Sequence, residues 1–112
     1  MKIIFTSTGK TWESEMDSRF GRAEYFVLYD EESREMTVID NGEVKNEAHG
    51  AGTATAQKMY ELKPDVLITG NGPGTNATAA LKNLKMKIFI NAVNISLKEA
   101  YDMYREGRLT EL

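Results

Sequence analysis

The segment from Gly70 to Asn76, with the sequence Gly-Asn-Gly-Pro-Gly-Thr-Asn, can present several backbone N–H groups to one ligand. It follows the apolar run Val66-Leu67-Ile68 and precedes a helical pattern over residues 77–84, so it predicts a strand, a glycine-rich turn and a helix start. N–H groups at the positive end of a helix dipole suit an anionic or polar ligand. The same residue types also form tight turns without a ligand, and neither the P-loop nor the dinucleotide-binding motif is present.

A second candidate lies in the long segment from Thr8 to Ala23, which is well above the usual length of a connection. Arg19 and Arg22 flank Phe20-Gly21, and two arginines at this spacing can clamp an anionic group while Asp17 orients one of them. The alternative is a solvated loop in which Arg19 or Arg22 pairs with Asp17.

His49 is the only histidine, and it lies in the glycine-rich segment His49-Gly50-Ala51-Gly52-Thr53. It is either a metal or cofactor ligand or an ordinary surface residue. The chain has no cysteine, which excludes disulfides, cysteine nucleophiles and thiolate metal sites, so any metal needs nitrogen or oxygen ligands. Trp12 is either a partner-facing anchor or a ring folded back over the core.

Length and charge restrict the possible partners. The 112 residues predict a single domain over residues 1–112. With 14 basic and 17 acidic residues the net charge is -3, which argues against nucleic acid as a partner. The apolar run at the amino terminus is too short for a signal sequence or a membrane span, so we expect a cytoplasmic protein with no membrane partner.

Hydrophobic patterns predict the elements that position these segments. The order is βββαβαβα, which predicts an α/β fold with a mixed five-stranded sheet flanked by helices, similar to the ribonuclease H-like architecture. Ser96-Leu97-Lys98-Glu99 forms a capping box at the start of the last helix. The expected strands are residues 3–5, 25–29, 36–39, 66–69 and 87–90, and the expected helices are residues 53–62, 77–84 and a third from residue 97.

This topology predicts that the candidate loops meet at one edge of the sheet. If the first, third, fourth and fifth strands run in one direction, the loops 8–23, 49–53, 70–76 and 91–94 all lie at their carboxyl ends, where open α/β sheets bind ligands. No nucleophile with its base and no carboxylate cluster can be assembled there. The first strand also lacks the carboxylate of a two-metal nuclease, so we expect a protein that is not an enzyme.

Three segments together resemble the dinitrogenase iron-molybdenum cofactor biosynthesis family, in particular its small stand-alone members. They are Asp17-Ser18-Arg19-Phe20-Gly21-Arg22-Ala23 leading into Tyr25-Phe26, then His49 to Thr53, then Asp65 to Asn76. The resemblance implies a ribonuclease H-like fold without nuclease activity. It also implies a role in binding or carrying an iron-molybdenum or iron-sulfur type cofactor, with metallocluster assembly proteins as partners.

One position departs from the family pattern. Cofactor-carrying members often have a histidine at the position of Arg19, and arginine cannot ligate iron as histidine does. Arginines and backbone N–H groups can instead hold an anionic cluster by charge-assisted hydrogen bonds. The alternative function is a protein-interaction or regulatory module anchored by Trp12 and Phe20. The candidate cofactor-binding residues are Arg19, Phe20, Gly21, Arg22, His49, Gly50, Gly52, Thr53, Gly70, Asn71, Gly72, Gly74 and Asn76, with His49 as the candidate metal ligand.

Overall fold

Six strands form one mixed sheet in the order β3-β2-β1-β4-β5-β6. The computed structural model describes residues 1–42 and 51–112, with backbone alone for residues 51–54, 56, 75 and 76. The described elements, in chain order, are β1 (Lys2–Ser7), β2 (Tyr25–Asp30), β3 (Glu35–Asp40), α2 (Ala51–Leu62), β4 (Val66–Ile68), α3 (Thr75–Asn83), β5 (Lys87–Ile90), α4 (Leu97–Arg105) and β6 (Thr110–Glu111).

The strand directions are those that the sequence predicts. β1 is antiparallel to β2, with Ile4 opposite Leu28, and parallel to β4, with Ile4 opposite Leu67. β2 is antiparallel to β3, and β4 is parallel to β5. The carboxyl ends of β1, β3, β4 and β5 therefore lie at one edge of the sheet, called the carboxyl edge below, and the opposite side is the amino edge.

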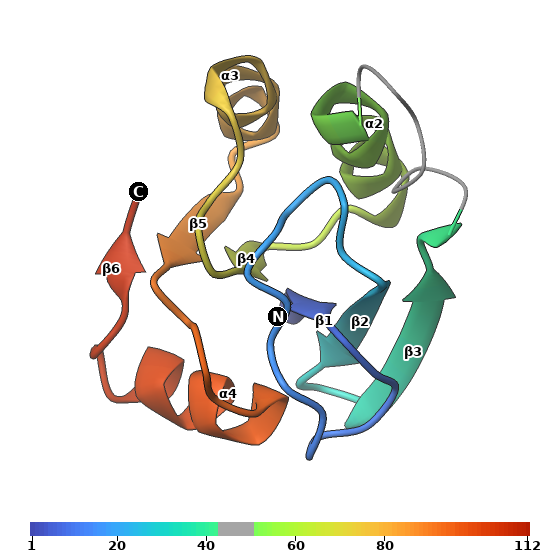
Figure 1. Cartoon of the computed structure of the whole chain (residues 1–112). Coiled ribbons are helices and arrows are strands. Elements are labelled where there is room, and N and C mark those ends of the chain that lie inside the picture. Colours follow the sequence, from blue (N-terminus) through green and yellow to red (C-terminus); the bar gives the residue numbers. More distant parts are fainter. Residues whose placement is uncertain (43–50) are drawn as a thin grey trace.

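The helices cover both faces of the sheet, with α2 and α3 on one face and α4 on the other (Figure 1). Side chains of β1 alternate between the two faces, as the period of a strand requires. Ile4 packs into the cluster with α2 and α3, while Ile3 and Phe5 pack into the cluster with α4. Within the described residues, no helix is both long enough and apolar enough to cross a membrane.

The start of α4 confirms the predicted capping box. The Glu99 N–H donates to Ser96 Oγ at 3.1 Å, and the Ser96 N–H donates to Glu99 Oε1 at 3.3 Å. Trp12 folds back over this face of the sheet, and its ring lies 5.0 Å from that of Tyr29 and 5.6 Å from that of Tyr101. Trp12 is therefore a part of the packing against α4.

Two of the sequence predictions are wrong in detail. The sheet has six strands instead of five, because β6 pairs antiparallel with β5. Its two residues, Thr110 and Glu111, are both exposed, so no hydrophobic alternation marks them as a strand. α2 begins at Ala51, so Gly52 and Thr53 are helical and do not belong to a loop.

Tyr101→Phe is expected to reduce the loss of stability at alkaline pH. Burial raises the pKa of Tyr101 to about 12, together with the hydrogen bond that its Oη–H donates to Glu31 Oε2 at 2.6 Å and the negative charge of Glu31. A pKa that rises on folding stabilises the fold below the unfolded value of about 10, and this contribution is lost as the pH rises through the folded value. Denaturant titrations between about pH 9 and 12 would show a flatter stability profile for the variant.

Glu31→Gln is the companion variant, since it keeps a hydrogen-bond acceptor but removes the charge, and it should give an intermediate profile. Some alkaline loss should remain in both variants because burial also raises the pKa of Tyr104. Identical profiles for Tyr101→Phe and the wild type would contradict the prediction.

Candidate functional site

The segment between β1 and β2 is fixed to the carboxyl edge by hydrogen bonds to three strands or their ends. The Asp17 N–H donates to the Thr6 carbonyl at 2.9 Å, and Thr6 Oγ1 donates to the Asp17 carbonyl at 2.7 Å. Thr6 Oγ1 also lies 2.8 Å from Thr69 Oγ1, just after β4. The Met16 N–H donates to the Ile95 carbonyl at 2.8 Å, before α4. The residues around Asp17 are thus held in place by the sheet.

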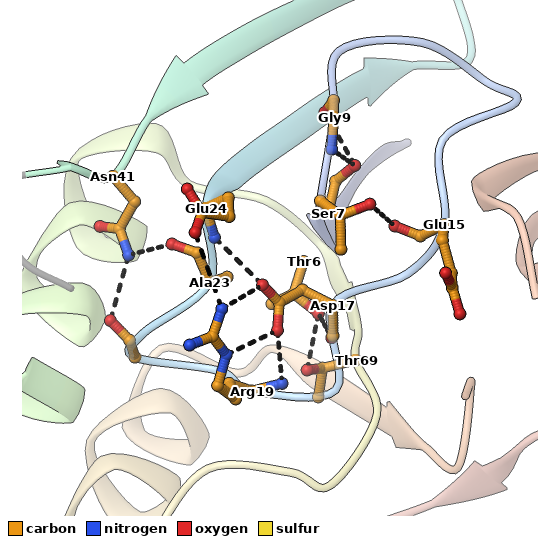
Figure 2. Close-up of polar contacts among 12 residues, drawn as sticks. Thr6, Ser7, Gly9, Glu15, Asp17, Arg19, Ala23, Glu24, Asn41 and Thr69 are labelled. Carbon is orange, nitrogen blue, oxygen red and sulfur yellow. Dashed lines mark hydrogen bonds and ion pairs between the residues drawn. The ribbon is translucent and has the colours of Figure 1, made fainter. Parts of the chain in front are cut away.

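The Asp17 carboxylate is the centre of this arrangement (Figure 2). It is 3% exposed and accepts four hydrogen bonds. Oδ1 accepts from the Arg19 backbone N–H and from Arg19 Nε, both at 3.0 Å. Oδ2 accepts from Arg19 Nη2 at 2.9 Å and from the Glu24 backbone N–H at 3.2 Å. The pairing of Arg19 with Asp17, one of the two sequence alternatives, is therefore the observed one.

These contacts set the charge state of both side chains. Burial acts to raise the pKa of Asp17, but the hydrogen bonds from Arg19 and Glu24 and the Arg19 charge outweigh it, so the pKa is lowered from its ordinary value. The hydrogen bond to Asp17 raises the pKa of Arg19. Both groups are charged at neutral pH, and Arg19 keeps a half-exposed side chain, at 52%, in a fixed orientation.

Nη1, the guanidinium nitrogen on the side away from Asp17, has no hydrogen-bond partner among residues 1–42 and 51–112 (Figure 2). A guanidinium in this state can donate to an oxygen or sulfur atom of a ligand without breaking its pair with Asp17. Glu24 Oε1 lies 4.0 Å from Nη2 and limits the excess positive charge on that side.

Gly70 allows the Asp17 segment to cross the end of β4. A Cβ atom at Gly70 would lie 2.5 Å from Ser18 Cα and 3.0 Å from the Ser18 carbonyl oxygen, so only glycine fits. The Asn71 N–H donates to this Ser18 carbonyl at 2.8 Å, and the Asn91 N–H donates to the Gly70 carbonyl at 2.7 Å. Three of the loops predicted to converge therefore meet here.

The rest of the glycine-rich turn is more open. Gly72 has a φ of +85°, a left-handed conformation that favours glycine. Gly74 is the residue before the first turn of α3, it provides no side-chain cap, and a Cβ added to it would meet no atom within 4 Å. The positive end of the α3 dipole therefore faces open space at Gly74.

Asn41 is a site residue that the sequence analysis missed. Its side chain is fully buried just after β3, and Nδ2 donates to the carbonyls of Gly21 at 3.1 Å and Ala23 at 2.9 Å. Thr55 of α2 also donates to the Gly21 carbonyl, at 3.4 Å. Asn41 Oδ1 is buried without a hydrogen-bond partner in the described chain. The position of Asn41 at the carboxyl end of a strand is the signal that would have found it.

The predicted site residues fall into three groups. Arg19, Gly21 and Arg22 lie on the Asp17 segment and are at least partly exposed, as are Asn71, Gly72 and Gly74. Phe20, at 4% exposed, packs on Phe26 in the core, and Gly70 is buried under Ser18 and Val93, so these two are structural positions. His49 and Gly50 lie outside the described residues, while Gly52, Thr53 and Asn76 are described only as helical backbone.

Neither anchor of the interaction hypothesis is a free surface residue. Phe20 is in the core, and Trp12 packs against Phe5, Tyr29 and Tyr101. Among the residues that the structure describes, no group of three His, Asp or Glu side chains is placed to hold a metal ion. The chemistry available at the carboxyl edge is therefore hydrogen-bond donation to an anion.

Fold and site together define a small α/β domain with an arginine-bearing edge at the carboxyl ends of its strands. The chain belongs to the dinitrogenase iron-molybdenum cofactor family, whose model matches residues 1–107. A comparison with curated protein sequences gives no match.

Solved structures agree with this assignment. The apo form of the orange protein from Desulfovibrio gigas is similar with a TM-score of 0.92 and 29% identity, over 99% of this chain and 92% of that one. TM1290 from Thermotoga, described as NifB-like and as a member of the DUF35 family, has a TM-score of 0.84 and 36% identity over 99% and 92% of the two chains. PH0822 shares the fold alone, with a TM-score of 0.75 and 17% identity over 98% and 94%.

Proposed function

We propose that this chain is a non-catalytic carrier that binds an anionic metal-containing cofactor of the iron-molybdenum or iron-sulfur type at its carboxyl edge. The observation that carries the proposal is the Arg19 guanidinium, which Asp17 holds by two side-chain hydrogen bonds while Nη1 stays available. Family membership and the similarity to an orange protein structure in an apo form support a ligand of this class.

The donor set fits a whole anionic cluster better than a bare metal ion. The chain has no cysteine, and the described residues contain no set of three metal-ligating side chains. Arg19 and the N–H groups near Gly74 are instead donors, which recognise the outer oxygen or sulfur atoms of an anion. In this proposal the cofactor's own ligands hold its metals, and the protein supplies charge, orientation and partial exclusion of water.

A carrier must also release what it binds, so its partners would be metallocluster assembly proteins that deliver or accept the cofactor. The open space at Gly74 suits such an exchange, because the site is at an edge and not in an enclosed cavity. The absence of a nucleophile paired with a base in the described site agrees with a carrier role instead of a catalytic one.

The test is an anaerobic titration of the protein with isolated iron-molybdenum cofactor and, separately, with a synthetic iron-sulfur cluster. Visible absorption and Trp12 fluorescence would report binding. Arg19→Ala should weaken binding by about tenfold or more, since it removes a charge-assisted donor. Gly74→Leu should weaken it similarly by filling the space before α3, without touching Asp17.

Arg108→Ala is the matched control, because Arg108 pairs with the exposed Glu106 near the carboxyl terminus. It should bind the cofactor as the wild type does. Circular dichroism of each variant would establish that it is folded. Unchanged signals of the wild type with both probes, or equal affinities for Gly74→Leu, Arg19→Ala and Arg108→Ala, would refute the proposal.

A further inference from the structure

A cavity of about 380 Å³ lies at the amino edge, on the opposite side of the sheet from the candidate site. It is formed where α2 and α3 end and where β4 and β5 begin, and its lining includes Met59, Lys63, Asp65, Leu84, Lys85 and Met86. This volume is within the range of small-molecule sites in proteins. None of the residues assigned above to the carboxyl edge contributes to it.

The floor of the cavity is apolar. Met59 of α2 is fully buried, Met86 is 5% exposed just before β5, and Leu84 is partly buried at the end of α3. Methionine side chains are flexible and polarizable, so such a floor can adapt to ligands of different shapes. This part of the cavity suits an aliphatic or aromatic group.

The rim carries two cations. Lys63 directly follows α2 and Lys85 follows the last turn of α3, and both side chains are exposed. Neither forms an ion pair within the part of the chain that the structure describes. The carboxylate of Asp65, also on the rim, is engaged at the start of β1, where its Oδ2 accepts the Lys2 N–H at 2.8 Å.

The backbone also fixes where the two lysines start. Lys63 and Lys85 have left-handed φ values of 51° and 60°, a conformation that glycine usually supplies at the end of a helix. Their N–H groups donate to the carbonyls of Met59 at 2.8 Å and Lys82 at 3.0 Å. Two lysines thus occupy positions where glycine is easier to accommodate, on two sides of one apolar cavity.

We propose that this cavity is a second binding site, for a small organic anion with an apolar body and a carboxylate, sulfonate or phosphate group. The apolar body would lie on Met59, Leu84 and Met86, and the anionic group would lie between Lys63 and Lys85. The site is independent of the carboxyl edge and of the proposed carrier function.

The test compares two fluorescent probes with similar aromatic bodies, the anion 8-anilinonaphthalene-1-sulfonate and the neutral N-phenyl-1-naphthylamine. The wild type should bind the anion saturably and more tightly than the neutral probe. The double variant Lys63→Gln, Lys85→Gln should weaken binding of the anion by about tenfold or more and leave the neutral probe within about twofold. NMR amide shifts on addition of the anion should centre on residues 63–65 and 84–86.

The control is the double variant Lys10→Gln, Lys98→Gln, which removes the same charge elsewhere and should bind both probes as the wild type does. Arg19→Ala should also leave the binding of both probes unchanged, which separates this site from the cofactor site. An absence of saturable binding, shifts centred elsewhere, or equal effects of the two lysine pairs would overturn the proposal.

Discussion

Gly70→Ala is expected to lower the melting temperature by about 10 °C, or roughly 3 kcal/mol in the free energy of unfolding. The added methyl group would lie 2.5 Å from Ser18 Cα, and a backbone atom cannot move aside as the end of a flexible side chain can. The Asp17 segment would have to lift from the end of β4, which strains the hydrogen bond from the Asn71 N–H to the Ser18 carbonyl. Calorimetry would measure the shift.

Gly74→Ala is the matched control for this substitution. The same methyl group is added in the same turn, but it would meet no atom within 4 Å, and the φ of -68° suits alanine. We expect a cost below about 1 kcal/mol, from the poorer capping preference of alanine. Similar losses in the two variants would show that the close approach of Ser18 is not what requires glycine at position 70.

Asp17→Asn is expected to cost about 2 to 3 kcal/mol at neutral pH, because a buried amide cannot accept all four of the N–H groups that now converge on the carboxylate. The pKa of Asp17 is lowered in the folded state, so its contribution is present above the unfolded pKa of about 3.9 and is lost as the pH falls through the folded value. The stability curves of the wild type and the variant should therefore approach each other in acid.

Urea titrations at several values between about pH 2 and 7 would test this. Asp102→Asn is the control, since Asp102 forms an exposed pair with Lys98 at 3.5 Å and should cost less than about 0.5 kcal/mol at any of these values. If Asp17→Asn has the same small effect at pH 7, or if the two curves stay parallel in acid, the role assigned to the buried carboxylate is wrong.

The sequence predicts the architecture well because most elements have strong local signals. Alternation and apolar runs mark β1 to β5, and the capping box at Ser96 marks α4. The edge at which the loops meet follows from the strand directions alone. β6 has no such signal, because its only stabilising feature is pairing with β5, a contact that two exposed residues do not encode in their pattern.

The site itself is less predictable than the fold. The spacing of Asp17, Arg19 and Arg22 permits either arginine to pair with the carboxylate, and only the structure selects Arg19. Phe20 has the same sequence context as its polar neighbours, yet it points into the core. Asn41 is one asparagine among several in the sequence, and its burial depends on the carbonyls of Gly21 and Ala23 coming within reach.

The hydroxyl pair of Thr6 and Thr69 has a consequence for how the chain folds. These residues are 63 positions apart, whereas β1, β2 and β3 follow one another as a local meander. Contacts between distant segments carry the larger loop-closure entropy and tend to slow folding. We therefore expect the meander to form before β4 docks on β1. The Asp17 segment lies across that late junction, so a chain arrested with only its local contacts would have no assembled binding edge.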